Sequence, residues 1–269
     1  MDAVQRHRFV PSRVSGPRLD TRPRSPSLVL RGALRHAARA HSGKAEIGAL
    51  ALLYGIYELV RGVRHVAYSS AVGNADEIVD IERRLHVFAE AAVQRMTDGV
   101  AFLPDALALL YPVLHFTVSI GVLVWVYRKR RHDFALVRTA LVAMTSLALI
   151  GFVVFPVAPP RLAVSGFVDT VSRYSPLDLG SSILGRFYNP VAAVPSLHFA
   201  YALLFAGAIL VLARRTAIRV AAAAYPPLVL LVITATGNHF FFDAATGAVV
   251  AALGVGIAVV VARSAHAPS

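Results

Sequence analysis

Cysteine is absent from this 269-residue chain. Its absence excludes disulfides, thiolate metal sites and cysteine nucleophiles together, and it leaves the redox compartment open. Ionisable side chains are also scarce inside the long apolar runs, and apolar residues make up 57% of the sequence, with a mean hydropathy of +0.62. Both values are well above those of a soluble domain. The composition therefore indicates one polytopic membrane domain with appendages.

The net charge of +12 does not indicate a nucleic-acid partner. The arginines lie in the N-terminal tail and in short loops, as membrane orientation requires, and no basic module with interleaved aromatic residues is present. Residues 1–44 are basic and lack the apolar run that a cleavable signal needs. We expect 1–44 to be a mostly disordered cytoplasmic tail on anionic lipid and 45–265 to be the membrane domain. The excess of arginine over lysine is typical of a high-GC bacterium, which favours a bacterial plasma membrane.

Six apolar stretches each approach the ~20 residues needed to cross the hydrocarbon core. They run roughly over 46–66, 105–127, 135–156, 196–213, 219–237 and 243–263. Between the first two, the segment 76–96 has apolar residues at three- and four-residue steps with charged residues between them, which predicts an amphipathic helix in the interface. The predicted fold is therefore all-α, with six transmembrane helices and one amphipathic helix.

Positive charge sets the expected orientation. Basic residues cluster in the loops at 128–138 and 214–219, so these loops and both termini are expected in the cytoplasm. The segment 157–195, the turn at 237–243 and the amphipathic helix then lie on the outer side.

Polar residues gather at the outer ends of the predicted spans. Arg161 follows two prolines that stop the third span. Ser196 is a good helix-start residue, with His198 in the first turn, and the free N–H groups of a helix start suit an anion. His239 and Asp243 are four residues apart, so on a helix the carboxylate can hold the imidazole. Three outward turns thus bring these side chains to one membrane depth.

This convergence favours phosphoester transfer. Arg161 and the helix start at Ser196 would bind the phosphate oxygens. His239 would attack phosphorus, with Asp243 fixing its tautomer, and His198 would protonate the departing oxygen. Water or an alcohol would then take the phosphoryl group from His239, and nothing in the motifs distinguishes the two acceptors.

Other interpretations stay open at this point. A histidine at the end of a span is more often an interfacial residue than a catalyst, and a transporter or scaffold could keep the fold without the chemistry. Metal-assisted hydrolysis could use His198, His239 and Asp243 as ligands, although further acidic residues near them are lacking. His115, inside the second span, is expected to pack or to line the substrate. The oligomeric state is left open.

The motif VPSLHFA, followed later by TGNHFFFDAATG, is similar to the second and third motifs of the type-2 phosphatidic acid phosphatase superfamily. APPRL and NPVAAVPSLH resemble the branch that includes the fungal inositol phosphorylceramide synthase, an inositolphosphotransferase. The resemblance covers about 45 to 263. It implies a six-helix membrane enzyme that acts on a lipid phosphoester through a phosphohistidine, without a metal or other cofactor. By motif position, His239 matches the nucleophile, Asp243 its partner, His198 the general acid and Arg161 the first-motif arginine.

Three positions depart from the pattern of the superfamily. Val154 stands where most members have lysine, Ile233 where they have arginine, and Leu197 where they have glycine. Two phosphate-binding cations are therefore missing, which favours the transferase branch over a simple phosphatidate phosphatase. The resemblance then implies that the phosphate is bound by Arg161, Asn238, the backbone at Ser196, and Arg186.

Overall fold

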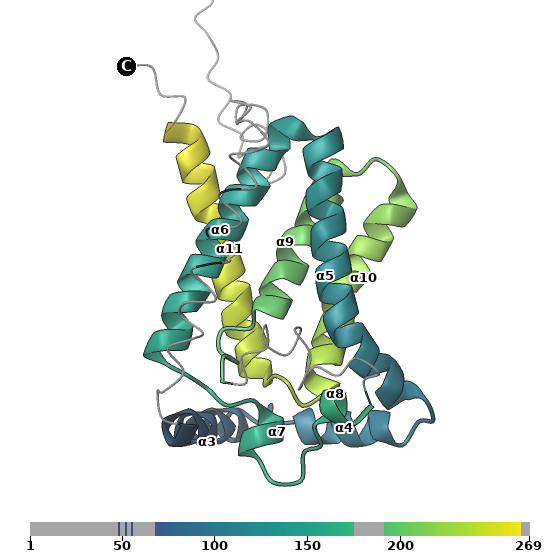
Figure 1. Cartoon of the computed structure of the whole chain (residues 1–269), viewed down its shortest axis with the longest axis vertical. Coiled ribbons are helices and arrows are strands. Elements are labelled where there is room, and N and C mark those ends of the chain that lie inside the picture. Colours follow the sequence, from purple (N-terminus) through teal and green to yellow (C-terminus); the bar gives the residue numbers. More distant parts are fainter. Residues whose placement is uncertain (1–47, 49–51, 53–54, 56–67, 175–190, 265–269) are drawn as a thin grey trace, which may run out of the picture.

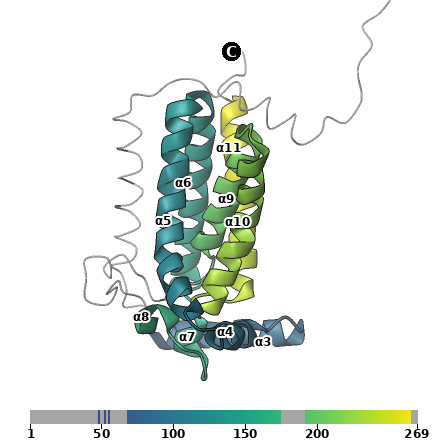
Figure 2. The ribbon, with the colours of Figure 1, turned by 90° about the vertical axis from the view of Figure 1, so that its right-hand side faces the viewer.

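The computed structural model describes residues 48, 52, 55, 68–174 and 191–264. The helices of the two continuous stretches are α3 (Tyr68–Arg84), α4 (Glu90–Asp98), α5 (Leu103–Lys129), α6 (Arg131–Val154), α7 (Pro160–Ala163), α8 (Thr170–Tyr174), α9 (Leu197–Leu212), α10 (Thr216–Ala235) and α11 (Phe241–Ser264). Helices α5, α6, α9, α10 and α11 stand side by side, and α3 and α4 lie across one end of this bundle (Figures 1 and 2). The all-α prediction is confirmed for the described residues, which contain no strand.

Four helices, α5, α6, α10 and α11, are long and apolar enough to cross a membrane by length and composition. Helix α9 is also apolar but has only 16 residues. The chain is thus an integral membrane protein, and these five helices match the last five predicted stretches to within a few residues. The stretch predicted over 46–66 lies, apart from three single positions, outside the described residues, as does the tail at 1–44. The count of six spans stays a prediction.

The amphipathic helix predicted over 76–96 is instead two helices, α3 and α4, separated by a break at 85–89. His86 has a φ of 58°, and its N–H donates to Arg83 O at 3.0 Å, while the following N–H donates to Glu82 O at 2.9 Å. This pair of hydrogen bonds around a left-handed residue is the Schellman motif, which ends a helix. Glycine usually occupies the left-handed position. Because histidine occupies it here, the sequence gives no signal that the helix ends at this point.

The face that α4 turns toward the bundle is polar. All three of its buried residues are polar: Glu90, Gln94 and Thr97. The exposed residues of α3, the break and α4 include several apolar ones: Ile81, Leu85, Val87 and Met96. A helix in the membrane interface directs its apolar side toward lipid. The polar face of α4 is therefore left to contact the ends of the long helices, while the buried residues of α3 are apolar except for Glu82.

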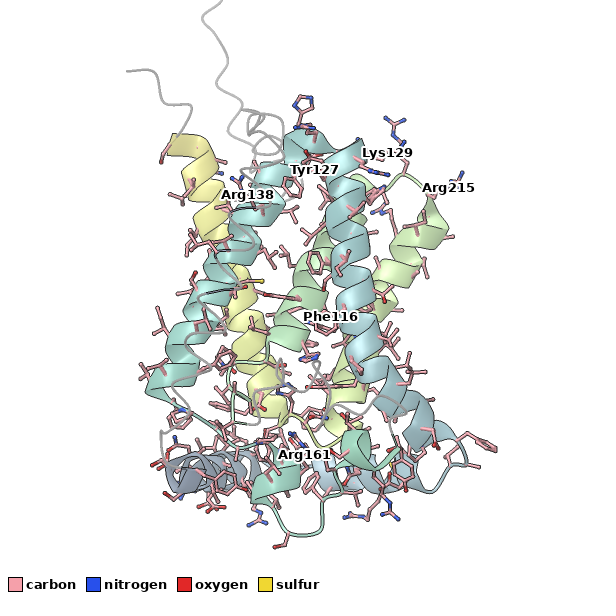
Figure 3. All side chains as sticks on the ribbon, in the orientation of Figure 1. Phe116, Tyr127, Lys129, Arg138, Arg161 and Arg215 are labelled. Atoms are coloured by element: carbon pink, nitrogen blue, oxygen red, sulfur yellow. The ribbon has the colours of Figure 1, made fainter. Side chains whose placement is uncertain are left out.

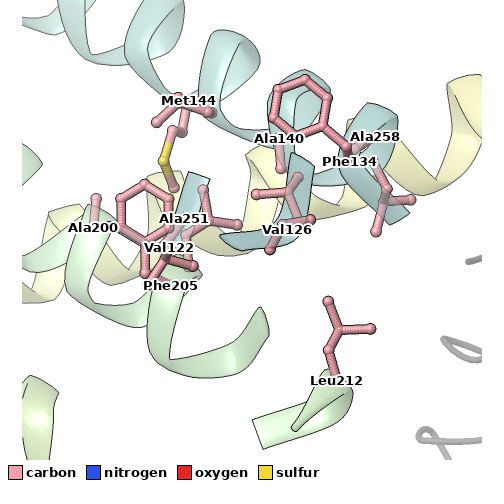
Figure 4. Close-up of a cluster of buried hydrophobic side chains, with 14 residues drawn as sticks. Val122, Val126, Phe134, Ala140, Met144, Ala200, Phe205, Leu212, Ala251 and Ala258 are labelled. Carbon is pink, nitrogen blue, oxygen red and sulfur yellow. The ribbon is translucent and has the colours of Figure 1, made fainter. Parts of the chain in front are cut away.

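Close contact between small residues holds the long helices together. A cluster of buried side chains from α5, α6, α9 and α11 includes Met144, Phe205 and Ala251 (Figure 4). A Cβ built on Gly254 would come within 2.8 Å of Met144 Cβ and 2.9 Å of Ala140 O. Apolar side chains gain little by leaving lipid, so membrane helices depend on such close packing of small residues. Helices α6 and α11 are an example.

The two ends of the bundle differ in charge. Lys129, Arg138 and Arg215 lie at one end, and Arg161 lies at the other, next to α3 and α4 (Figure 3). The α5–α6 and α9–α10 connections are both at the first end, where Arg130 Nη2 donates to Leu212 O at 2.7 Å. We call these the basic end and the Arg161 end.

Cysteine labelling tests whether the two ends face opposite sides of the membrane. The chain has no native thiol, so Asp80→Cys on α3 and Arg215→Cys before α10 each introduce a single exposed one. A membrane-impermeant maleimide should label one variant in intact cells and the other only after the membrane is opened. Labelling of both variants from the same side would contradict this arrangement.

Candidate active site

Main-chain hydrogen bonds join the three segments that carry the sequence motifs. The N–H of Arg161, in α7, donates to Gly237 O at 3.0 Å, in the turn between α10 and α11. The N–H of Ser196, just before α9, donates to Asp243 O at 2.9 Å, in the first turn of α11. Main-chain atoms thus join residues that are far apart in the sequence.

Gly237 makes the turn between α10 and α11 possible. Its φ of 70° lies in the left-handed region, which glycine adopts without steric cost. A Cβ at this position would also lie 3.1 Å from Val168 O and 3.2 Å from both Arg161 Cβ and Gln94 Nε2. The chain leaves α10 through this crowded turn, which places His239 directly beyond the end of α10.

His239 and Asp243 form a buried pair. His239 Nδ1 and Asp243 Oδ2 are 3.0 Å apart, and the same carboxylate oxygen accepts the N–H of Phe240 at 2.9 Å. The side chains are 6% and 0% exposed. A carboxylate only accepts hydrogen bonds, so Nδ1 is the protonated nitrogen of this pair. Nε2 is then the ring nitrogen that remains for chemistry.

His198 approaches this pair from α9. Ser196 is the N-cap of that helix, and its Oγ accepts the N–H of Phe199 at 3.4 Å. The cap places His198 in the first helical turn, where its ring centroid is 5.8 Å from that of His239. Tyr111 of α5 stacks on His198, with their ring centroids 4.4 Å apart. The two imidazoles therefore lie side by side, one in α9 and the other in the turn that precedes α11.

The guanidinium of Arg161 is held by two side chains. Nη1 donates to Asn238 Oδ1 at 2.8 Å, and Nε donates to Asp169 Oδ2 at 3.1 Å. The Arg161 side chain is 2% exposed. Because Asn238 precedes His239 in the chain, these bonds fix the cation beside the turn that carries the imidazole.

A family model described as the PAP2 superfamily matches residues 76–257. The chain belongs to this superfamily. No curated protein and no solved structure gives a significant match. PAP2 members are phosphatases and phosphotransferases that act on phosphoesters, and the resemblance to that superfamily is confirmed. The match does not distinguish the inositolphosphotransferase branch.

The structure describes all three positions at which this PAP2 chain departs from the superfamily pattern, and Leu197 is the first residue of α9. Val154, at the end of α6, is 76% exposed on the outside of the helix bundle. Ile233 of α10 is buried and lines a cavity of about 10 Å³ that holds at most one water-sized sphere. Arg186 lies outside the described residues.

The same cavity contacts a third histidine, His115, which we expected to pack or to line the substrate. Its ring centroid is 4.2 Å from that of His198 and 5.3 Å from that of Tyr201. Tyr201 and Thr145 share a hydrogen bond of 2.7 Å. The remaining lining residues are Leu110, Tyr111, Leu114, Tyr225, Val229 and Val232. A short row of polar rings thus continues from His198 into the helix bundle, surrounded by apolar walls.

Sequence reasoning missed Gln94 of α4. Its Nε2 donates to Val168 O at 2.9 Å and to Ala235 O at 3.1 Å, and its Oε1 accepts the N–H of Val168 at 2.9 Å. These bonds tie α4 to the end of α10 and to the loop that carries Asp169. A glutamine within a charged amphipathic segment is expected at the protein surface, so no local signal in the sequence indicated that Gln94 is buried. No group of three or more potential metal ligands occurs among the residues that the structure describes.

Gly247 provides a test of how closely α9 and α11 must approach. A Cβ on Gly247 would lie 2.5 Å from Ser196 O, whereas one on Gly256 of the same helix would meet nothing within 4 Å. Gly247→Ala should therefore push the start of α9 away from α11, separate His198 from His239, and cost about 1–3 kcal/mol of stability. Thermal unfolding in detergent and turnover measure these effects.

Gly256→Ala is the matched control for that variant. It should leave activity unchanged and leave stability equal or higher by up to about 1 kcal/mol, because alanine is the better helix former. Equal behaviour of the two variants would show that the Gly247 contact does not position the site.

Proposed function

We propose that the chain transfers a phosphoryl or phospho-head group from a lipid phosphoester through a phosphohistidine on His239. The observation that carries this proposal is the buried His239–Asp243 pair, with the His198 ring 5.8 Å from the His239 ring. Arg161 is fixed beside the same turn through Asn238. A nucleophile, an orienting carboxylate, a proton donor and a cation are the groups that phosphoester transfer without a metal requires.

In the first half-reaction, Nε2 of His239 attacks phosphorus, so an N–P bond forms as the P–O bond to the leaving group breaks. His198 donates its proton to the departing oxygen. Asp243 accepts the Nδ1–H of His239 and stabilises the positive charge that the phosphorylated ring carries. In the second half-reaction, an acceptor hydroxyl returns a proton to His198 and attacks phosphorus, and the N–P bond breaks.

Phosphate binding is assigned to Arg161, Asn238 and the start of α9, with Arg186 kept as a further candidate. The backbone N–H of Ser196 donates to Asp243 O. We therefore propose that Ser196 acts as the helix cap and that the next N–H groups, at Leu197 and His198, face the phosphate. The first N–H groups of a helix lack intrahelical acceptors, which suits them to an anion.

We further propose an alcohol acceptor, as in the inositolphosphotransferase-like branch, with hydrolysis by water as the alternative. Two features support this choice. The lysine and arginine positions of most superfamily members are occupied by Val154 and Ile233, and the walls beside His198 are mainly apolar. An apolar wall excludes water and so protects a reactive phosphohistidine from hydrolysis.

The Arg161 end is proposed to face the outside of a bacterial plasma membrane, with both termini in the cytoplasm. Basic residues between α5 and α6 and between α9 and α10 gather at the opposite end of the bundle, as Figure 3 shows for Lys129 and Arg215. Cytoplasmic loops carry such an excess of positive charge. The cysteine labelling described above reports the orientation directly.

Substitution of the proposed pair tests the mechanism. His239→Ala should abolish turnover and any acid-labile phosphoenzyme, because no nucleophile remains. Asp243→Asn should retain the fold but lower kcat by roughly a hundredfold or more, because the imidazole loses its orienting carboxylate. Turnover and trapping of labelled phosphoenzyme measure both effects. His132→Ala, at an exposed position at the basic end, is the control and should behave as the parent. Full activity in His239→Ala would overturn the mechanism.

The acceptor can be identified with purified protein in liposomes. Labelled lipid phosphates and phosphoinositides are supplied with and without alcohol acceptors, and free phosphate is compared with transferred head group. We expect the transferred product to dominate when an alcohol is present, and the activity to survive a chelator because no metal takes part in the proposed mechanism. Release of free phosphate alone would establish the phosphatase alternative, and loss of activity with the chelator would contradict metal independence.

A further inference from the structure

Two glutamates of the interfacial helices point into the protein. Glu82 of α3 and Glu90 of α4 are 1% and 0% exposed, although glutamate is rarely fully buried unless it is paired. Glu82 Oε1 accepts the N–H of Phe242 at 2.6 Å, and Glu90 Oε1 accepts the N–H of Phe241 at 2.8 Å. Both N–H groups belong to the first turn of α11, where a helix has no acceptors of its own.

Three carboxyl groups thus receive three consecutive N–H groups at the start of α11. The N–H of Phe240 donates to Asp243, that of Phe241 to Glu90, and that of Phe242 to Glu82. The middle and last acceptors come from α4 and α3, which lie across the end of the bundle. The turn that carries the His239–Asp243 pair is therefore hydrogen-bonded to both interfacial helices.

The second oxygens of the two glutamates require an explanation. Oε2 of Glu82 and Oε2 of Glu90 are both buried and have no hydrogen-bond partner among the described residues. No arginine or lysine in the described part of the chain forms an ion pair with either of them. An unpaired buried polar atom is costly, and an unpaired buried charge costs more. One proton shared between the two carboxyl groups would give both second oxygens a partner.

The electrostatics agree with a retained proton. Burial and the adjacent carboxyl group of Glu90 raise the pKa of Glu82 to about 9. The charge of Asp243 raises this pKa as well, and the only opposing contribution is the N–H of Phe242. In the folded protein Glu82 therefore keeps its proton at neutral pH and loses it as the pH rises through about 9.

We propose that Glu82 and Glu90 form a proton-sharing carboxyl pair that positions Asp243 against His239 by holding the first turn of α11. The pair does not touch the substrate; it acts on the reaction through Asp243. This role rests on the proposed function of His239. Loss of the shared proton would place two negative charges beside Asp243 in a buried site, and the first turn of α11 would then shift.

Glu82→Gln separates the hydrogen bonds from the charge. The amide oxygen can still accept the N–H of Phe242, and the amide nitrogen can donate to Glu90 without any proton to lose. The variant should keep the parent's kcat at neutral pH. We expect the parent's kcat to fall as the pH rises through about 9, and this fall should be absent in the variant. Glu77→Gln, at an exposed position on the same helix, is the matched control and should retain that fall.

Glu82→Leu removes the hydrogen bonds while keeping a side chain of similar size. The N–H of Phe242 and the second oxygen of Glu90 then lack partners. We expect kcat to fall about tenfold or more with little change in KM, because the geometry of the nucleophile is disturbed rather than substrate binding. If this variant does not fold, the pH dependence of kcat in Glu82→Gln decides whether the pair has the proposed positioning role.

Infrared spectroscopy tests the shared proton without reference to activity. The carbonyl stretch of a protonated carboxyl group should titrate with a midpoint near pH 9 in the parent and in Glu77→Gln, and should be missing in Glu82→Gln. Absence of such a band in the parent would overturn the proposal that Glu82 and Glu90 share a proton.

The two proposals fail in different ways. A normal infrared titration, together with an unchanged alkaline fall in Glu82→Gln, would overturn the positioning role and leave the proposed function intact. Full activity in His239→Ala would instead remove the nucleophile, and with it the positioning role, while the infrared titration would be unaffected.

Discussion

The first turn of α11 must find hydrogen-bond acceptors in a place that its neighbours close off from water. A buried backbone N–H group that lacks a hydrogen-bond partner is costly. The first N–H groups of a helix have no acceptor within the helix itself. Asp243, Glu90 and Glu82 meet this requirement, one residue from each of α11, α4 and α3. The interfacial helices are therefore a structural part of the site, and the polar face of α4 and Glu82 of α3 turn inward for this reason.

The segment from Gly237 to Asp243 also organises the other two motif segments through its carbonyl groups. Asp243 O accepts the N–H of Ser196, and Gly237 O accepts the N–H of Arg161. Because these two bonds are made by main-chain atoms, they do not depend on which side chains stand at positions 154 and 233. This explains how Val154 and Ile233 can replace cations that most superfamily members carry without disturbing the placement of Arg161. The side chains then decide which phosphoester and which acceptor are accepted.

How much the sequence predicts depends on how local the signal is. Long apolar runs are local, so α5, α6, α9, α10 and α11 could be read directly, and the alternating direction of the spans put Arg161, His198 and His239 at one end. The inward face of α4 could not be read, because its burial is set by N–H groups of α11 far away in the sequence. The break at His86 was also hidden, since histidine holds a left-handed position that glycine usually marks.

Charge explains why a shared proton suits this arrangement. Three carboxyl groups around one helix start would place three negative charges in a buried region if all were ionised, and their repulsion would be screened only weakly. A proton between Glu82 and Glu90 keeps every acceptor that the N–H groups need and removes one of those charges. Asp243 then has less like charge opposing its own, and it can serve the imidazole of His239. In the proposed mechanism, the positive ring that would form on phosphoryl transfer meets negative charge that the fold has already put in place.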